Sequence, residues 1–365
     1  MALTGIPSTD LASRLAEQTL ELVDIASESR AERDIAEHVV RVLEAGGVPV
    51  RAAGDSCVLA GASARDERPY VLLAGHLDTV PAQANWPGRR IENGVTGLGA
   101  SDMKGGVAVM LELALARAAG RQEWGAFDVG YVLFGREELP SYESALAPLL
   151  AREAGLREAE LAIVLEPTAN VVQAGCLGNI DATWTFAGRA GHSARPWLAE
   201  NAIDRAVAAI AELHARGPQL EAIEGLEFAE VATVTMLQAG VARNVIPGEC
   251  TANVNFRYSP RLAPDEAERA LRERCATHGE LELLSNSAGA LPPQANPLFD
   301  GLLAASGVPA QAKQAWTPVA EFAAAGIEAV NLGPGDPALA HRVDERISTA
   351  ALVRAYEILE SFLCG

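Results

Sequence analysis

Two kinds of apolar pattern alternate along the first part of the chain. Apolar residues recur at helical spacing from Leu11 to about Ala26 and from Ala31 to Ala45, and residues 104–119 and 144–155 also predict helices. Short continuous apolar runs at 71–76, 129–135 and 161–167 predict buried strands. Strands that alternate with helices in this way are typical of an α/β sheet whose two faces are covered.

The pattern changes after about Gly178. Strand candidates at 181–188, 229–240, 250–258 and 280–285 enclose helix candidates at 200–217 and 264–279. This β-α-β-β-α-β order predicts a ferredoxin-like α+β unit. A strand at 328–336 and a closing helix at 348–363 follow it. We therefore predict one domain built from residues 1–178 and 291–365, with residues 179–290 inserted as a second domain.

Length and charge restrict the possible functions. A chain of 365 residues exceeds the usual size of a single core, which agrees with two domains. The 29 basic and 48 acidic residues give a net charge of -19, which disfavours binding to nucleic acid or to an anionic membrane. The N-terminus lacks the pattern of a signal peptide and no segment is apolar enough to span a membrane, so we expect a cytoplasmic protein.

The five cysteines argue against two kinds of site. They are odd in number, scattered, and never arranged as CxxC. This pattern disfavours both a disulfide framework and a zinc site built from thiolates. We expect reduced thiols.

Polar residues with possible metal chemistry follow several of the apolar runs. His76 and Asp78 come at the end of the first predicted strand, in LLAGHLDTVP, and Asp102 lies in the glycine-rich turn GLGASDMKGG before a helix. Taken alone, the turn is open to a phosphate or a cation. It lacks the spacing of a P-loop or a dinucleotide site, and the acidic residue at its centre favours a cation.

Carboxylates and a second histidine complete the set. Glu137 and Glu138 follow the second run and point to opposite sides of extended backbone, so one can bind a metal while the other faces the space above it. Glu166 ends the third run, and His341 follows a Gly/Pro-rich turn. Any one of these is more often a solvated or hydrogen-bonded residue. Together, imidazoles and carboxylates without thiolate suit catalytic Zn²⁺, with Mn²⁺ or Co²⁺ as substitutes.

The segments GHLDTVP, GLGASDMKGG, REE, EPT and GPGDPALAH resemble a known family. It is the family of di-zinc amidohydrolases and peptidases that includes succinyl-diaminopimelate desuccinylase, acetylornithine deacetylase and glutamate carboxypeptidase. The resemblance spans nearly the whole chain. It implies a zinc-peptidase-like catalytic domain with a mixed sheet flanked by helices, and an inserted lid that carries a homodimer interface.

The resemblance also implies a role for each candidate residue. His76, Asp102 and Glu166 would hold one zinc, and Asp102, Glu138 and His341 the other, with Asp102 as the bridge. Glu137 would be the general acid/base, Asp78 would orient His76, and the Asp102–Met103 peptide bond is often cis in such proteins. His192, in AGRAGHSARP of the inserted domain, would reach the active site of the partner subunit and polarise the substrate carbonyl.

The implied substrate is a small anionic N-acyl amino acid. Asn244 and Arg257 match positions that grip substrate carboxylates, and Thr317 and Gly333 are candidate contacts. The first choice is removal of succinate from N-succinyl-L,L-2,6-diaminopimelate in lysine biosynthesis. Deacetylation of acetylornithine or acetyllysine and carboxypeptidase action on glutamate stay open as alternatives.

Two observations bear on these alternatives. Pro318 and Glu321 stand where related chains commonly show Asp and Arg, and Glu321 would repel an anionic acyl group if it faced the pocket. An inactive metal-bound scaffold is the alternative from another class of protein. Glu137 argues against a scaffold, because a protein that merely binds metal has no use for an unligated carboxylate above the ions.

Overall fold

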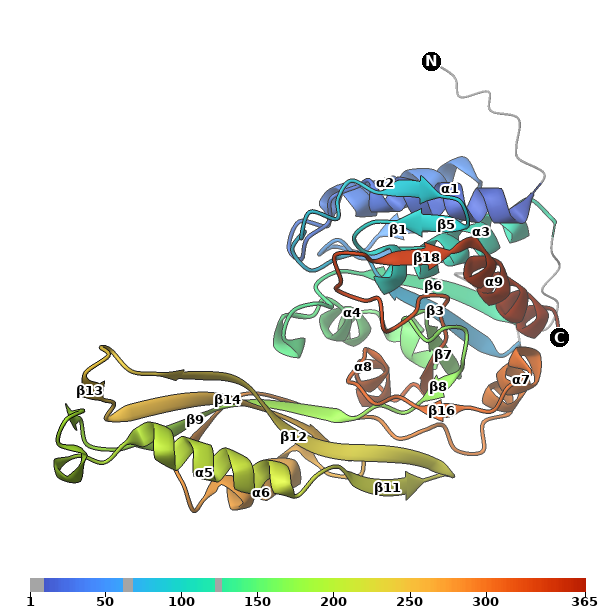
Figure 1. Cartoon of the computed structure of the whole chain (residues 1–365). Helices are drawn as coiled ribbons and strands as arrows, with labels where there is room; N and C mark the ends of the chain where they lie inside the picture. The colour runs from blue at the N-terminus through green and yellow to red at the C-terminus, as the bar shows by residue number, and fades with distance from the viewer. Residues whose placement is uncertain (1–9, 62–67, 122–126) are drawn as a thin grey trace. The chain divides into compact units, whose positions relative to one another are not determined.

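The computed structural model describes residues 10–61, 68–121 and 127–365 (Figure 1). The chain folds into two compact units. The first is formed by residues 1–174, 292–311 and 317–365, and the second by residues 175–291 and 312–316. The sequence pattern had assigned residues 312–316 to the first domain. The first nine residues, where no signal peptide was expected, lie outside the described part.

A mixed eight-stranded sheet forms the centre of the first unit. Its middle strands, β6 (Asp128–Phe134), β3 (Tyr70–His76), β7 (Leu161–Val164) and β17 (Ala329–Asn331), run parallel to one another and are buried throughout. This burial explains their continuous apolar sequences. The outer strands are β1 (Val50–Ala52), β2 (Val58–Gly61), β8 (Gln173–Ala174) and β16 (Gln311–Ala312).

Helices cover both faces of this sheet. On one side lie α1 (Leu11–Val23), α2 (Arg33–Ala45), α3 (Gly105–Ala118) and α9 (Thr349–Cys364), and on the other lie α4 (Leu146–Arg152) and α8 (Val319–Ala324) (Figure 1). Another helix, α7 (Pro297–Ser306), packs against α9. Helix α3 is apolar on nearly all sides because it lies between the sheet and the helices α1 and α9.

A small antiparallel sheet ties the C-terminal part of the first unit to its N-terminal part. Strand β18 (Arg346–Ser348) pairs with β5 (Gly94–Thr96), which also pairs with β4 (Arg89–Ile91). The short helical turns are η1 (Ala100–Lys104), η2 (Ser141–Glu143) and η3 (Ala154–Glu158). The pairing of β18 with β5 brings residues just after His341 next to the chain that leads to Asp102.

The second unit contains the predicted ferredoxin-like arrangement. Its antiparallel sheet has the order β11 (Gln219–Ile223), β12 (Leu226–Ala239), β14 (Glu249–Tyr258), β9 (Gly178–Ala187) and β15 (Glu280–Ser287). Helices α5 (Ala202–Ala215) and α6 (Pro264–Cys275) pack on one face, over a core that includes Trp184, Phe186 and Phe256. The sequence pattern missed β11, whose residues are largely exposed.

A separate two-stranded sheet and one more turn complete the second unit. Strand β10 (Gly191–His192) pairs with β13 (Val245–Ile246), and the turn η4 (Pro196–Leu198) follows β10. In the described part of the chain the five cysteines form no disulfide, and four of them are buried. Among the described helices, none has the length and the apolar composition needed to cross a membrane.

Candidate active site

The candidate ligands lie where parallel strands end. His76 is the last residue of β3, Glu137 and Glu138 follow β6, and Glu166 follows β7. Strands β6, β3 and β7 are neighbours and run in the same direction, so their carboxyl ends meet at one edge of the sheet. Sequence positions far apart are thereby brought to a single place.

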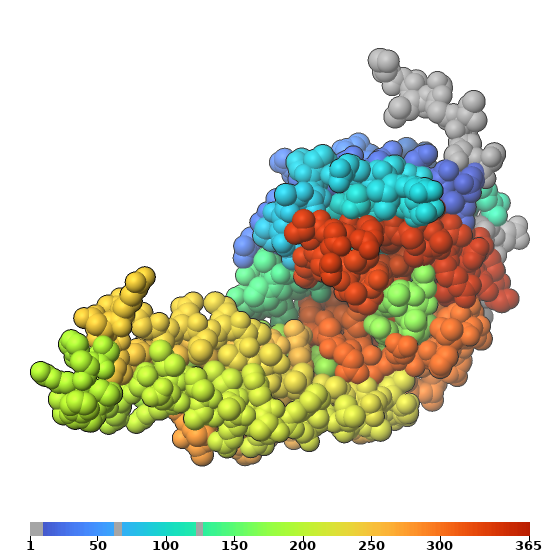
Figure 2. Space-filling model, viewed as in Figure 1, coloured from blue at the N-terminus to red at the C-terminus, as the bar shows by residue number. Residues whose placement is uncertain are grey.

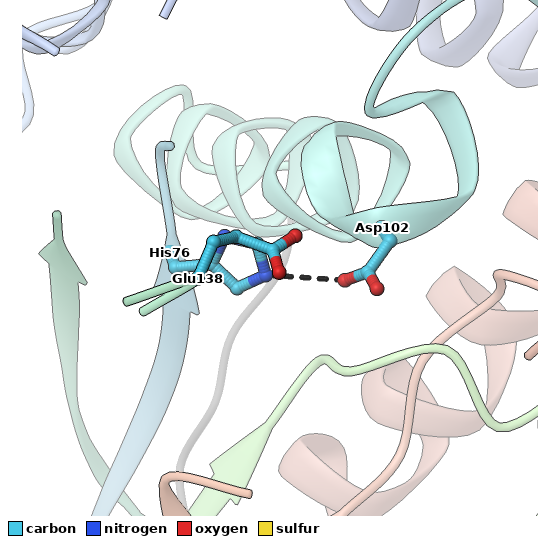
Figure 3. A group of neighbouring side chains, drawn as sticks. All are labelled: His76, Asp102 and Glu138. Carbon is cyan, nitrogen blue, oxygen red and sulfur yellow. Dashed lines mark hydrogen bonds and ion pairs between the residues drawn. The ribbon is translucent and has the colours of Figure 1, made fainter. Parts of the chain in front are cut away.

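Asp102 lies between two imidazoles. Its Oδ1 is 3.1 Å from Nε2 of His76, and its Oδ2 is 3.5 Å from Nε2 of His341. Glu166 Oε1 is 3.8 Å from Nε2 of His76, and Glu138 Oε1 is 3.0 Å from Nε2 of His341. Figure 3 shows His76, Asp102 and Glu138 pointing toward one another. The structure therefore brings together all five residues named as metal ligands.

The turn that carries Asp102 has an unusual backbone. The Asp102–Met103 peptide bond is cis, as the resemblance implied. Gly99, at the start of this turn, has a φ of 79°, which favours glycine. A Cβ at Gly99 would also lie 2.9 Å from Thr79 and 3.1 Å from Lys104, so both conformation and space require glycine here.

The two histidines differ in exposure. The His76 side chain is fully buried, whereas the His341 side chain is 48% exposed. The loop of His341 is held by Gln83 and Asn85, whose side-chain amides donate to the carbonyl oxygens of His341 and Arg342. Figure 2 shows the C-terminal segment, in red, at the surface beside the cyan residues near 90. One side of the cluster is thus closed and the other is open to solvent.

Asp78 holds residues next to the candidate ligands through hydrogen bonds. Its carboxylate accepts hydrogen bonds from the Ser29 hydroxyl at 2.7 Å and from the backbone N–H groups of Glu137 at 3.0 Å and Glu138 at 3.1 Å. The Nδ1 of His76 is 3.0 Å from the backbone oxygen of Asp78 and 3.6 Å from its carboxylate. Asp78 therefore contacts His76 mainly through its backbone, while its side chain holds the segment of the two glutamates.

Burial and mutual charge shift the pKa values in this cluster. Burial opposes a charged His76, but the nearby carboxylates of Asp102 and Asp78 outweigh burial and raise the pKa of His76 well above the ordinary value. Bonds to Asp102 and Glu138 raise the pKa of His341 to about 10. Burial first, and then the negative charge of Glu166, raise the pKa of Glu137 well above its ordinary value. The carboxylates of the site thus favour a positive charge among them. The raised pKa of Glu137 makes this carboxylate easier to protonate.

These properties fit a metal centre. Two groups offer ligand atoms within 4.8 Å of one another, one formed by His76, Asp102 and Glu138 and the other by His76, Glu137 and Glu166. Nitrogen and oxygen donors of this kind suit Zn²⁺, and a cation satisfies the surplus of negative charge. Glu137 belongs to the second of these groups, so its carboxylate lies close to the position that an ion held by His76 and Glu166 would take.

In the second unit, the structure separates the candidate residues. His192 and Asn244 are exposed neighbours, since the backbone oxygen of Asn244 accepts from the N–H of Ser193 at 3.0 Å. His192 follows Ala187, the last residue of β9, which pairs with Glu249 at the start of β14. Arg257 is half-buried eight residues beyond Glu249, or about 27 Å further along β14. Its Nε donates to Asn255, and burial lowers its pKa. A small substrate cannot contact His192 and Arg257 of the same chain together.

Two other candidates, Thr317 and Gly333, belong to the first unit and are buried. The N–H of Gly333 donates to the Thr168 hydroxyl at 3.0 Å. A Cβ at Gly333 would collide with the backbone oxygens of Leu165 and Glu166. Glycine is therefore needed for close packing against the end of β7, whether or not it contacts a substrate.

Glu321 lines a hollow between α4 and α8 that contains none of the candidate metal ligands. It lies in α8 beside Ser144 and Ala147, at the start of α4, and is 8% exposed. Burial raises its pKa to about 7. Pro318, the other residue that differs from the one common in related chains, precedes the first turn of α8, where proline is well tolerated.

The sequence pattern missed residues that support the site without touching its centre. Ser29 donates to Asp78, and Glu32 accepts from the backbone N–H of Arg136 at 3.1 Å, next to the two glutamates. Both lie between α1 and α2, far along the chain from the residues that they hold. No local pattern marks them, because only the folded chain shows what they contact.

Two family models match parts of the chain. Residues 176–281 match the peptidase dimerisation domain, and residues 58–170 match peptidase family M28. The first match falls within the second unit, and the second match contains four of the five candidate ligands. Each match therefore lies within one of the two units, 58–170 in the first and 176–281 in the second.

Curated relatives match over nearly the full length. The candidate succinyl-diaminopimelate desuccinylase DapE of Mycobacterium tuberculosis is 36% identical over 359 residues, which cover 98% of this chain and 99% of that protein. The succinyl-diaminopimelate desuccinylase of Corynebacterium glutamicum is 34% identical, with 98% of each chain covered.

Solved structures share the fold. An M20 family metallo-carboxypeptidase from Sulfolobus solfataricus has a TM-score of 0.75 at 17% identity, covering 98% of this chain and 99% of that chain. A Bacillus subtilis protein described as a dinuclear metal binding peptidase has a TM-score of 0.69 at 15% identity, with 97% of each chain covered. With the full-length relatives, these findings show that the chain belongs to the family of metal-dependent amidohydrolases and peptidases that includes the succinyl-diaminopimelate desuccinylases.

Proposed function

We propose that this chain is a two-zinc desuccinylase, which hydrolyses N-succinyl-L,L-2,6-diaminopimelate to succinate and L,L-diaminopimelate, a step of lysine biosynthesis. The observation that carries the proposal is the place of Asp102, which offers one carboxylate oxygen to each of two histidines. A bridging carboxylate between two metal sites needs this arrangement. The full-length relatives named as desuccinylases support the substrate.

The proposed reaction divides the work among the residues of the first unit. His76, Asp102 and Glu166 would hold one zinc ion, and Asp102, Glu138 and His341 the other. When bound, zinc supplies Lewis acidity that makes water nucleophilic and polarises the amide carbonyl. Glu137 accepts the proton of the attacking water and returns it to the leaving amine, a role that suits a carboxylate whose pKa is raised.

The second unit would supply substrate contacts from two subunits. Arg257 suits a substrate carboxylate, because a guanidinium donates parallel hydrogen bonds to it. His192 would polarise the substrate carbonyl, and its neighbour Asn244 would, like Arg257, contact a substrate carboxylate. Thr317 and Gly333 of the first unit would add further substrate contacts. Since His192 and Arg257 lie far apart in one chain, we propose that His192 serves the active site of a partner subunit in a homodimer. The match to a dimerisation domain supports this assembly.

A deacetylase or a glutamate carboxypeptidase would use the same metals and the same base. Glu321 had been the main argument against an anionic acyl group. Its position against the start of α4 weakens that argument, since its carboxyl is largely covered. The desuccinylase therefore stays the preferred function.

The substrate is tested by a side-by-side assay of the zinc-loaded protein. N-succinyl-diaminopimelate, N-acetylornithine, N-acetyllysine and folyl-glutamate are compared by kcat/KM. We expect the succinylated substrate to be preferred by at least about tenfold, because a charged carboxylate paired with arginine adds more than about 1.4 kcal/mol. Preference for any of the other three would reject the desuccinylase assignment, and no turnover of any amide would favour the scaffold.

A further inference from the structure

We propose that Glu345 is a positioning residue for the metal centre, which fixes Asp102 between the two histidines. The inference rests on the proposed metal site and adds a residue to which no role has been assigned. Glu345 lies four residues after His341, at the end of the same loop, and is 1% exposed. It has no hydrogen bond to either histidine among the described residues, so it acts through the backbone.

The carboxylate of Glu345 binds the turn that carries Asp102. Its Oε1 accepts from the backbone N–H groups of Ser101 at 2.8 Å and Asp102 at 3.0 Å, and its Oε2 accepts from the N–H of Gly99 at 3.0 Å. Three N–H donors on one buried carboxylate compensate much of the cost of burying its charge. The hydrogen bond to the N–H of Asp102 fixes the backbone of the bridging residue itself.

The backbone of Glu345 binds the same turn from its other end. The carbonyl oxygen accepts from the N–H of Gly97 at 3.0 Å and from the Thr96 hydroxyl at 2.7 Å. Further along, the Ser101 hydroxyl donates to the backbone oxygen of Asp336 at 3.0 Å. The turn of Asp102 and the loop of His341 are therefore joined at both ends of that loop, at Asp336 and at Glu345.

This double attachment has a consequence for metal binding. Asp102 must present one oxygen to His76, which is anchored in β3, and the other to His341, whose loop is at the surface. Glu345 links the turn to the surface loop, so it sets the distance between the bridging carboxylate and His341. Groups that orient metal ligands typically change metal affinity or activity by about 10- to 100-fold when they are replaced.

Glu345→Gln is the sharpest test. The amide keeps the shape of the side chain, but its NH₂ group cannot accept a hydrogen bond, so at least one backbone N–H is left facing a donor. We expect the zinc dissociation constant of Glu345→Gln, measured by chelator competition on the full chain, to rise about 10- to 100-fold. We also expect turnover to recover when excess zinc is added.

Glu112→Gln is the matched control. Glu112 is equally buried, but its partners are Arg14 on α1 and Arg121, and among the described residues no hydrogen bond or ion pair joins it to a candidate ligand. We expect this variant to lower the Tm of the zinc-free protein while zinc affinity stays within about twofold of wild type. A positioning residue moves zinc affinity, whereas a merely structural one moves only Tm.

The outcomes separate this inference from the proposed function. Wild-type protein that binds two zinc ions, together with Glu345→Gln that binds them with unchanged affinity, overturns the role of Glu345 alone. Wild-type protein that binds no zinc at a defined stoichiometry rejects the metal site.

If circular dichroism shows that Glu345→Gln does not fold, Glu345→Asp takes its place, because it keeps the charge but is one methylene too short to reach all three donors. Wild-type zinc affinity in Glu345→Asp overturns the inference equally.

Discussion

The candidate residues of the first unit converge, whereas those of the second unit do not. In the first unit, two histidines and the carboxylates near them lie within hydrogen-bond or ion-pair distance, and Ser29, Asp78 and backbone N–H groups hold them. In the second unit, His192 is exposed in the separate two-stranded sheet that follows the Ala187 end of β9, whereas Arg257 is half-buried and pairs with Asn179 at the other end of β9.

The difference indicates how each unit contributes to a site. The five candidate metal ligands all lie in the first unit, where parallel strands bring His76, Glu138 and Glu166 to one edge of the sheet. The second unit offers single side chains that need other groups to form a site. Variants in the first unit should therefore act within their own chain, and variants of His192 across a subunit boundary.

The largest effect is expected at Glu137 in the first unit. Glu137→Gln removes the proposed proton acceptor but keeps the size of the side chain. We expect kcat to fall by about 10²- to 10⁴-fold, which is the usual contribution of a general base. Zinc content, measured by elemental analysis, should stay at the wild-type value.

The structure makes the zinc measurement decisive. Glu137 lies with His76 and Glu166 in a group that could itself hold an ion. Loss of one zinc from Glu137→Gln would therefore make Glu137 a ligand, and its role as the base would have to be abandoned.

The next effect is expected at His192 in the second unit. His192→Ala should lower kcat by about 10²- to 10³-fold, the typical result of removing one group that stabilises a developing oxyanion. His192 is exposed, and in the described part of the chain its imidazole makes one hydrogen bond, in which Nδ1 accepts from the N–H of Ala194, so Tm should not change.

Mixing inactive variants tests whether His192 acts across subunits. When His192→Ala and Glu137→Gln proteins are mixed and allowed to exchange, half of the dimers are mixed, and one of their two sites is complete. We expect about a quarter of wild-type activity to return. If both residues serve the same chain, no site in the mixture is complete and activity stays absent.

A smaller effect is expected at Asp78, which supports the first unit. Asp78→Asn places an NH₂ group among donors, since Ser29 and the N–H groups of Glu137 and Glu138 all point at this carboxylate. We expect zinc affinity to fall by about 10- to 100-fold. Ser29→Ala removes only one of these donors and should have a lesser effect; equal losses in the two variants would contradict this ranking.

The sequence predicts the candidate ligands of the first unit better than the residues that hold those ligands in place, for a physical reason. His76, Glu138 and Glu166 follow apolar runs, and the parallel sheet brings the ends of such runs together. Glu345 follows His341 closely, yet nothing in its local sequence shows that its partners begin at Gly99. Strand β11 was missed because its side chains are mostly exposed, so it lacks the apolar alternation of β9 and β14.

The smallest effect is expected at Glu321, a buried carboxylate of the first unit that lies against α4. Burial raises its pKa to about 7 in the folded chain, whereas an unfolded glutamate has a pKa of about 4.3. The folded state thus holds the proton more tightly, so the free energy of unfolding falls as pH rises between these two values and stays low above pH 7. Glu321→Gln removes the titrating group. At pH 8 we expect this variant to be more stable than wild type by on the order of 1 to 3 kcal/mol in urea unfolding, and the difference to vanish near pH 4.5.

Glu44→Gln, which removes an exposed carboxylate from α2, controls for the loss of one charge. A stability gain at pH 8 that is equal in both variants would trace the effect to net charge, and the burial of Glu321 would then have no part in it.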